Sequence, residues 1–538
     1  MLNPGNLLTQ TARRHPSRIG LVHGARRWTW GELERSANGL ARALAALGIE
    51  RGDRVIVQSP NSRWMLEAQY ALLRAGAVYI PVHARAIPRE TAQMVGLAGA
   101  KALILPAGLA ANAIEAEAQC STLQHVIVCS DTGEIPPHTP GRAQWHDYDR
   151  LARAHAGETL ALEVAPDDIC LQMFTAGTTG VPKGGMHSNR GFMAALTGRI
   201  ADVMPGLDID SALLAIGPLS HGTGTTATCC VMRGAKIVML EGHFDVGACW
   251  RLIEAERISE LFTVPTILMD LVRHPDAQRR DRSSLRHVVY AGAPINRTDQ
   301  KRALELLGPA LVQYYGSVEN MGTASVLHPW QHSLREDDPE APVGTAGVAR
   351  SGVRIAIRDA DGRDLPAGET GEIWIDGPGN FLGYQNMPEA TAAALKDGWV
   401  SSGDLGRLDE RGFLYIQGRS REMYKSGGLQ VYPNETQNYL GEHPAIAEAH
   451  VLSLPDSRWG EIGVAVVQLK AGAAATEAEL RAFLRTRMAA YKLPRRAWIW
   501  DEIPRSPVGK VPKPLLKAEL LARGLVREGE DVPGADQA

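Results

Sequence analysis

The chain has 538 residues, of which 44% are apolar and 22% are charged, and its 57 basic and 60 acidic residues give a formal net charge of −3. This composition is typical of a globular protein with several domains, and it excludes disordered and fibrous classes. The small net charge excludes long-range attraction of nucleic acid or of an anionic membrane, so we expect small-molecule partners and no nucleic acid.

The cysteines and the apolar segments indicate where such a chain resides. Its six cysteines form no C-x-x-C pair, which predicts small buried residues in a reducing compartment rather than a disulfide or zinc framework. Leu7-Leu8 is too short for the apolar core of a signal peptide. Residues 211–232 lack Asp, Glu, Lys and Arg, but Pro218, His221 and the glycines make them too polar and broken for a membrane helix. We therefore expect a cytoplasmic protein without an integral membrane segment.

Helices and strands alternate in the first part of the chain. Thr29 and Glu32 form a capping-box pattern ahead of an apolar helical repeat that ends at Gly48. A second helix is expected to end at Arg74. Strands are expected at residues 54–57, 77–80, 102–105, 125–129 and 168–174. This alternation predicts an α/β fold with layered, mostly parallel sheets.

The pattern becomes antiparallel near Gly352. Residues 353–357 and Leu365 flank Asp361-Gly362, a hairpin-turn dipeptide, and 372–375 and 413–416 are further expected antiparallel strands. After Gly418 a smaller unit begins, with strands near 449–452 and 464–467 and a helix capped by Thr476 and Glu479. We expect a large N-terminal domain with a small β-barrel-like part, a small α+β C-terminal domain and a disordered tail, covering residues 1–418, 419–526 and 527–538.

A loop rich in glycine and threonine follows the strand expected at 168–174. Glycines let backbone N–H groups surround an anion, threonine hydroxyls add donors, and Lys183 adds a positive charge. The composition predicts a phosphate-binding loop, although a flexible surface turn is the alternative. It is not a Walker A loop, because no Gly-Lys is followed by Ser or Thr at the required spacing. The loop runs Thr175-Ala176-Gly177-Thr178-Thr179-Gly180-Val181-Pro182-Lys183-Gly184.

This loop resembles the signature loop of the adenylate-forming enzymes, which include acyl-CoA synthetases, firefly-type luciferases and the adenylation domains of peptide synthetases. Further segments resemble other motifs of that superfamily, in the same order and across nearly the whole chain. They are Tyr315-Gly316-Ser317-Val318-Glu319, Gly398-Trp399-Val400-Ser401-Ser402-Gly403-Asp404, Gly418-Arg419, Lys425-Ser426-Gly427-Gly428 and Pro507-Val508-Gly509-Lys510.

The resemblance implies an ATP-dependent acid–CoA ligase that works in two steps. A carboxylate, of a fatty or aryl acid, attacks the α-phosphate of ATP bound with Mg²⁺, and the thiol of coenzyme A then displaces AMP. Two positions depart from the family pattern: Val318 replaces a threonine that contacts the phosphates, and Ala176 replaces a serine. Neither change removes a charge or a metal ligand, so we expect an altered affinity for ATP or an altered rate rather than loss of activity.

The resemblance also implies a role for individual residues. Lys510 would join the attacking carboxylate to the α-phosphate, Glu319 would bind Mg²⁺, and Arg421 would be the hinge about which the mobile C-terminal domain turns. Further catalytic roles would fall to Lys425, Gln430 and His221. The acyl pocket would be formed by His221, Gly292, Ala293 and Tyr314, and coenzyme A would pass Gly427 and Gly428. ATP and AMP would contact Thr175, Ala176, Gly177, Thr178, Thr179, Gly180, Lys183, Gln313, Tyr314, Tyr315, Gly316, Val318, Asp404 and Arg419.

Other interpretations of the sequence stay open. The glycines of residues 222–227 fit the dinucleotide fingerprint G-x-G-x-x-A, and a strand at 236–240 ends in Glu241, as in a nicotinamide-dependent oxidoreductase. Against it, residues 217–221 separate the fingerprint from the preceding apolar run. A nucleotide-sensing binding protein is a third hypothesis, and an acyl-AMP ligase that passes its acyl group to a carrier protein or another acceptor is a fourth. His221 could equally be a core histidine, and a homodimer is common among members of the superfamily.

Overall fold

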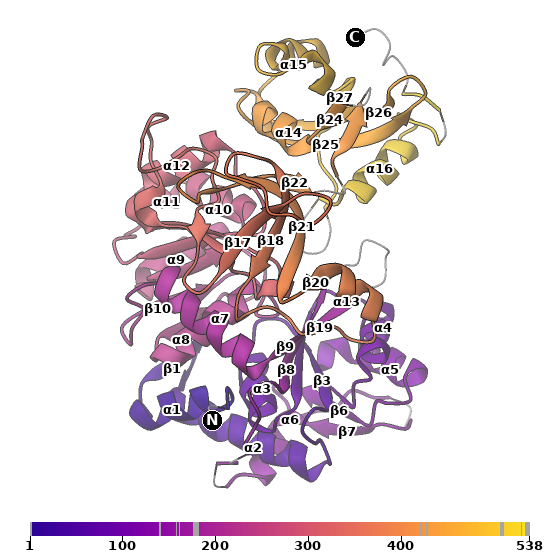
Figure 1. The fold of residues 1–538 in the computed structure, drawn as a ribbon. Coiled ribbons are helices and arrows are strands. Elements are labelled where there is room, and N and C mark those ends of the chain that lie inside the picture. The colour runs from indigo at the N-terminus through magenta and orange to yellow at the C-terminus, as the bar shows by residue number, and fades with distance from the viewer. Residues whose placement is uncertain are drawn as a thin grey trace.

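The computed structural model describes residues 3–138, 141–157, 159–160, 162–175, 182–419, 422–426, 429–505, 511–528 and 530–532. Figure 1 shows a large body that contains the N-terminus, and a smaller unit of orange and yellow elements that contains the C-terminal part of the chain. Within the described residues the strands form four sheets, three in the large body and one in the smaller unit.

The first large sheet has the strand order β19-β9-β8-β4-β3-β5-β6-β7. Its central strands β8, β4, β3, β5, β6 and β7 are parallel, and β9 and β19 extend it in antiparallel pairs. The strands are β3 (Arg54–Ser59), β4 (Val78–His83), β5 (Ala102–Pro106), β6 (His125–Cys129), β7 (Gln144–Asp147), β8 (Ile169–Thr175), β9 (Lys183–Ser188) and β19 (Gly383–Tyr384).

The second large sheet has the order β16-β15-β14-β13-β12-β10-β11-β1-β2 and a parallel centre from β14 to β1. Its strands are β1 (Ile19–His23), β2 (Arg26–Thr29), β10 (Ala212–Ala215), β11 (Lys236–Met239), β12 (Glu260–Thr263), β13 (His287–Tyr290), β14 (Leu311–Tyr315), β15 (Ser325–Leu327) and β16 (Val348–Ala349).

Alternate side chains of these strands point into different cores, as the two-residue period of a strand requires. Val55 and Val57 of β3 and Leu213 of β10 enter one shared core between the two sheets, while Ile56 and Leu214 face two outer cores. Helices α1 (Asn6–Arg14), α2 (Trp30–Ala46), α3 (Arg63–Arg74), α6 (Tyr148–Ala154), α7 (Asn189–Asp202) and α8 (Gly222–Arg233) contribute to the shared core. Outside lie α4 (Pro88–Ala98) and α5 (Ala110–Gln119) on the first sheet, and α9 (Val246–Ala255), α10 (Pro265–Arg273), α11 (Asp276–Arg279) and α12 (Arg297–Leu307) on the second.

Two antiparallel systems complete the chain. The third sheet contains β17 (Arg354–Arg358), β18 (Gly371–Asp376), β20 (Leu395–Lys396), β21 (Trp399–Leu408) and β22 (Leu414–Arg419), with α13 (Pro388–Ala394) beside it. The smaller unit contains β23 (Tyr424–Ser426), β24 (Leu429–Val431), β25 (Ile446–Asp456), β26 (Gly460–Leu469) and β27 (Arg496–Ile499), with α14 (Pro433–Gly441), α15 (Glu477–Arg485) and α16 (Lys513–Ala522).

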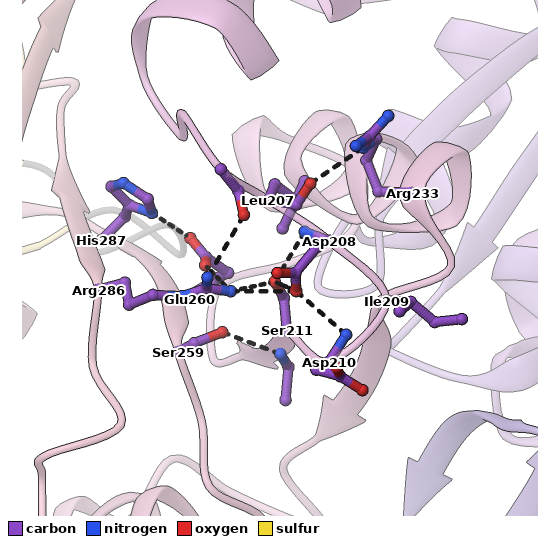
Figure 2. A network of polar contacts seen from close by, with 12 residues as sticks. Leu207, Asp208, Ile209, Asp210, Ser211, Arg233, Ser259, Glu260, Arg286 and His287 are labelled. Carbon is purple, nitrogen blue, oxygen red and sulfur yellow. Dashed lines mark hydrogen bonds and ion pairs between the residues drawn. The ribbon is translucent and has the colours of Figure 1, made fainter.

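Charged side chains hold together the amino-terminal edge of the second sheet (Figure 2). Glu260, the first residue of β12, is fully buried, and one of its carboxylate oxygens lies 2.8 Å from Nδ1 of His287, the first residue of β13. Arg286 approaches Glu260 to 3.7 Å and Asp208 to 3.4 Å. Buried charge is tolerated when it is paired in this way. These contacts therefore fix the edge of the sheet that is opposite to the carboxyl ends of its strands.

Most of the expected elements are present. Thr29 and Thr476 each form a capping box, the strand expected at 125–129 is β6, and β17 and β18 pair across the turn that contains Gly362. All six cysteines are buried and free. In the segment predicted to be disordered, Asp531 accepts a hydrogen bond of 2.7 Å from the backbone N–H of Ser457, and Val532 packs in a core of the smaller unit. The domain limits themselves remain predictions.

Candidate active site

The carboxyl ends of four neighbouring strands bring together several of the residues expected to form the site. Because β10, β12, β13 and β14 are parallel, the segments that follow them leave the same edge of the sheet. His221 follows β10, Gly292 follows β13, and Glu319 follows β14. Sites in parallel α/β sheets lie at this edge, and the predicted residues converge on it.

Tyr315, Asp404 and Arg419 form one polar cluster although they are far apart in the sequence. The Tyr315 hydroxyl donates to Asp404 at 2.7 Å, and Nε of Arg419 lies 3.4 Å from the other carboxylate oxygen. Asp404 and Arg419 face each other in the pairing of β21 with β22. Burial raises the pKa of Asp404, and burial together with the Asp404 charge raises that of Tyr315. The predicted nucleotide residues thus form a carboxylate with one phenol donor and one exposed guanidinium.

A second cluster centres on Tyr384, which the sequence did not single out. Its hydroxyl donates to Oε1 of Glu319 at 2.5 Å, and Nζ of Lys183 lies 5.1 Å from the centre of its ring. Tyr384 belongs to β19, which pairs with β9, the strand that begins at Lys183. One tyrosine therefore contacts both the predicted metal ligand and the lysine of the predicted phosphate-binding loop.

The segment between Tyr315 and Glu319 is tightly packed. A Cβ atom at Gly316 would lie 2.5 Å from the backbone of Gly322, so only glycine fits there without a shift. Val318 packs 3.7 Å from the Cβ position of Gly185 on β9, beside the strand that leaves the loop. Valine therefore occupies a position next to the loop where a threonine hydroxyl could act as a donor.

Tyr314 connects the predicted acyl pocket to the protein interior. Its ring stacks on Phe262 with centroids 5.8 Å apart, and its hydroxyl lies 3.2 Å from the Cβ position of Gly222, the first residue of α8. Gln313, on the opposite face of β14, accepts a hydrogen bond of 3.0 Å from Tyr290. These contacts place the Tyr314 hydroxyl beside Gly222, which follows His221, and orient Gln313 through a buried tyrosine.

His221 is the N-cap residue of α8 and is exposed. Its Nδ1 lies 2.8 Å from the hydroxyl of Ser220, and its ring meets that of His83 edge-on at 5.8 Å. An exposed ring at the carboxyl edge of the sheet is not a core histidine. Gly292, after β13, has a φ of +84° and is exposed together with Ala293.

Several predicted residues lie outside the described part of the chain. These are Ala176, Gly177, Thr178, Thr179, Gly180, Arg421, Gly427, Gly428 and Lys510, together with the side chain of Gln430. Thr175, which precedes the loop, donates to the carbonyl of Lys183 at 3.5 Å. The strands on the two sides of the loop, β8 and β9, are therefore paired as far as these two residues. Lys425 is exposed on β23, and its backbone pairs with Gln430 of β24.

The dinucleotide fingerprint proves to be a helix and not a phosphate loop. Gly222 and Gly224 lie in the first turn of α8, where a Cβ atom would meet Phe262 at 2.6 Å and the Leu219 carbonyl at 1.9 Å. The two glycines allow this helix to pack closely against Phe262 and Leu219. The spacing alone could not distinguish a packed helix from a loop.

Comparison with known proteins defines the class to which this fold and site belong. The AMP-binding enzyme family matches residues 8–385, and the C-terminal domain of AMP-binding enzymes matches residues 435–510. A feruloyl-CoA synthase of Amycolatopsis sp is 34% identical over 96% of this chain and 98% of its own length. A medium/long-chain fatty-acid–CoA ligase of Mycobacterium tuberculosis is 30% identical over 96% of this chain and 89% of its own. The structure of the amide bond synthetase McbA from Marinactinospora thermotolerans superimposes with a TM-score of 0.84, at 28% identity, over 96% of this chain and 99% of that one.

The chain belongs to the AMP-binding enzyme family. It is a ligase of the AMP-forming acyl-CoA type, a class that uses ATP and coenzyme A as substrates, so the nicotinamide-dependent oxidoreductase is wrong. Among the described residues, no helix is long and apolar enough to span a membrane.

Proposed function

We propose that the protein activates a fatty or aryl carboxylic acid with ATP and transfers the acyl group to coenzyme A. In the first step a carboxylate oxygen bonds to the α-phosphorus and the bond to pyrophosphate breaks. In the second step the thiol displaces AMP, which leaves with the bonding electron pair, and the thiol proton passes to solvent. The curated relatives that match nearly the whole chain include feruloyl-CoA synthase and fatty-acid–CoA ligases, which supports this substrate class.

The observation that carries the proposal is the meeting of Tyr315, Asp404 and Glu319 at one edge of the sheet. In the proposed complex, Tyr315 lies against the adenine and Asp404 accepts hydrogen bonds from the ribose hydroxyls. Arg419 lies near the same sugar, and Gln313 and Tyr314 line the edge of the base. The phosphates lie in the loop from Thr175 to Lys183. The hydrogen bond of 2.7 Å from the Tyr315 hydroxyl to Asp404 supports these roles, because it fixes the orientation of the Asp404 carboxylate beside Tyr315.

The residues present fit a magnesium ion. Glu319 offers a hard carboxylate oxygen, and Tyr384 holds that carboxylate from one side. When bound, Mg²⁺ would neutralise charge on the phosphates of ATP. Lys510 would supply a second positive charge where the two anions meet, and Lys183 would supply a third.

The second step would use the smaller unit. Rotation about Arg421 would withdraw Lys510 and bring Lys425, Gln430, Gly427 and Gly428 to the thiol. The domain limits at residues 418/419 and 526/527, a cytoplasmic location and a homodimeric state are parts of the same proposal.

Pyrophosphate release tests the proposal directly. Mg-ATP is supplied with fatty, aryl and short-chain acids, each with and without coenzyme A. We expect turnover that requires coenzyme A, and a loss of about 10²–10³-fold in Lys510→Ala, as expected when one pre-aimed charge is removed. Lys517→Ala, which changes an exposed lysine of α16, is the matched control.

The outcomes separate the alternatives. Pyrophosphate release that stops near one equivalent without coenzyme A, and that coenzyme A does not accelerate, would assign another acceptor to the second step. No release with any acid, with Lys510→Ala equal to wild type, would contradict adenylate formation itself. Acyl-AMP supplied from outside should still be converted to acyl-CoA by Lys510→Ala, because the lysine serves only the first step.

A further inference from the structure

A buried arginine lies behind the predicted acyl pocket. Arg199, on α7, is only 2% exposed. Its guanidinium donates to the hydroxyl of Thr226 at 3.2 Å, to that of Tyr314 at 3.3 Å and to that of Thr323 at 3.1 Å. It also lies 4.7 Å from the centre of the Tyr314 ring. All of these partners are neutral.

A guanidinium buried in this way is costly unless an anion accompanies it. In the part of the chain that the structure describes, no carboxylate lies within ion-pair distance of Arg199. The buried Arg74, by contrast, is paired with Glu34 at 2.7 Å, and the buried Glu260 lies 2.8 Å from Nδ1 of His287. Hydroxyl partners compensate a buried charge only in part, because each offers a dipole and not an opposite charge. The local bonding of Arg199 therefore differs from that of the structural ion pairs.

A second cation increases the imbalance. Arg350, 4% exposed, donates to the backbone carbonyl of Thr323 at 2.7 Å, while Arg199 donates to the hydroxyl of the same residue. Burial lowers the pKa of Arg350, and the positive charge of Arg199 lowers it further, while Asp202 acts in the opposite direction. Two guanidinium groups thus converge on one threonine, and the half-buried carboxylate of Asp202 accepts hydrogen bonds from the backbone N–H and the hydroxyl of Ser351.

The position of Arg199 connects it with the substrate. Tyr314 lies between its guanidinium, at 3.3 Å, and the Cβ position of Gly222, at 3.2 Å, and Gly222 directly follows His221. An acid whose reacting carboxylate lies near His221 would extend along Phe262 and Tyr314 towards Arg199. The hydroxyls of Tyr314 and Thr323 are bonded to the guanidinium, so an anion would bind to Arg199 by displacing them from it.

We propose that Arg199 is a specificity-determining residue that binds a second anionic group, a carboxylate, at the far end of the acid substrate. The inference rests on the proposed function, since it assigns the far end of the acyl chain in the same site. It narrows the substrate class to dicarboxylic acids with an aliphatic or aryl spacer. Arginine suits this task because its planar donors match a carboxylate in two-point bonding.

Pairs of acids that differ only at the far end test the proposal. Each dicarboxylic acid, with an aliphatic spacer of increasing length or with an aryl spacer, is compared with its monomethyl ester and monoamide. The readout is kcat/KM for coenzyme A-dependent pyrophosphate release. In the wild-type enzyme we expect the diacid of the fitting length to be preferred by about 10- to 100-fold, the range for hydrogen bonds to a charged group. In Arg199→Met, the KM for the diacid should rise by a similar factor and the neutral ester should become the better substrate.

Two further variants distinguish recognition from folding. Arg199→Lys keeps the charge, so it should keep the preference for the diacid in weakened form. Arg233→Met is the control. Arg233 is the last residue of α8 and donates to the backbone carbonyl of Leu207 at 2.9 Å, so its replacement should leave the preference for the diacid unchanged. Thermal unfolding of each variant shows whether the fold is kept.

The result that overturns the inference is specific. If wild type uses monoesters or simple monocarboxylic acids as well as the diacids, or if Arg199→Met lowers kcat/KM equally for both members of a pair, Arg199 is a structural residue. Turnover of monocarboxylic acids alone would refute the inference and leave the proposed function intact. Absence of turnover with every acid would instead refute the proposed function.

Discussion

Replacing Tyr384 by phenylalanine removes one hydroxyl group and leaves the ring in place. The hydroxyl donates to Glu319 at 2.5 Å, and the residue is 8% exposed. The ring is held independently of that bond, since it meets Phe381 edge-on at 4.9 Å and the backbone N–H of Tyr384 donates to Thr391 at 2.9 Å. The substituted ring would therefore keep the contact with Lys183 and lose the hydrogen bond to the carboxylate of Glu319.

The expected size of the effect follows from the nature of the bond. A hydrogen bond to a charged group contributes about 1.5–3 kcal/mol, and each ~1.4 kcal/mol corresponds to a tenfold change. If the bond serves to aim Glu319 at Mg²⁺, Tyr384→Phe should raise the Mg²⁺ concentration required for half-maximal rate by about 10-fold or more. The rate at saturating ATP should fall, because a mobile carboxylate no longer fixes the metal on the phosphates.

The assay is pyrophosphate release at fixed ATP and acid, titrated with Mg²⁺. Tyr415→Phe is the matched control, since its hydroxyl also donates to a carboxylate, that of Asp409 at 3.3 Å, away from the site. We expect that control to have the wild-type Mg²⁺ dependence. If Tyr384→Phe also follows the wild-type curve with an unchanged rate, Tyr384 does not position Glu319 and the argument from this bond is wrong.

Two further predictions concern a buried carboxyl group and the unusual valine. Burial raises the pKa of Glu67 from 4.5 to about 7, despite the nearby Arg63. Between these pH values the folded state keeps a proton that the unfolded state has lost. The free energy of unfolding should therefore fall by up to ~3 kcal/mol as the pH rises from 4.5 to 7. Urea unfolding at several pH values should show that Glu67→Gln lacks this fall; equal slopes in both proteins would place the Glu67 pKa near its ordinary value. Val318→Thr should lower the KM for ATP or raise kcat, because a hydroxyl beside β9 adds a donor near the loop; unchanged kinetics would mean that the position is silent.

Local signals predicted the elements well because their causes are local. A capping box is formed within four residues, and the turn at Gly362 requires a positive φ that glycine adopts freely. The alternation of strands and helices likewise predicted the parallel sheets. The convergence of Tyr315 with Asp404, which are 89 residues apart, was predicted only through the resemblance to a family.

Tyr384 and Arg199 could not be predicted in the same way. Tyr384 reaches Glu319 because β19 pairs with β9 at the edge of the sheet. The strand β19 has only two residues, Gly383 and Tyr384, and their sequence does not specify the strand with which they pair. Arg199 lies near the end of a helix in the sequence Thr-Gly-Arg-Ile, where an arginine is usually exposed. Its burial results from α8, β14 and the segment at Thr323 closing around it, which is a property of the tertiary structure.

Charged side chains have different kinds of partners at the two edges of the second sheet, and that difference supports the location of the site. At the amino-terminal edge, the chain itself supplies the partners of a buried carboxylate: Glu260 lies 2.8 Å from Nδ1 of His287 and 3.7 Å from the guanidinium of Arg286. Around the carboxyl edge, Glu319 is held by a phenol and Arg199 by three hydroxyls, all neutral. The half-buried Glu319 and the buried Arg199 would gain charged partners at this edge if ligands bind there. The Mg²⁺ of Mg-ATP would pair with the charge of Glu319, and a second carboxylate of the substrate would pair with that of Arg199. The same electrostatic argument thus underlies both the proposed metal site and the proposed substrate class.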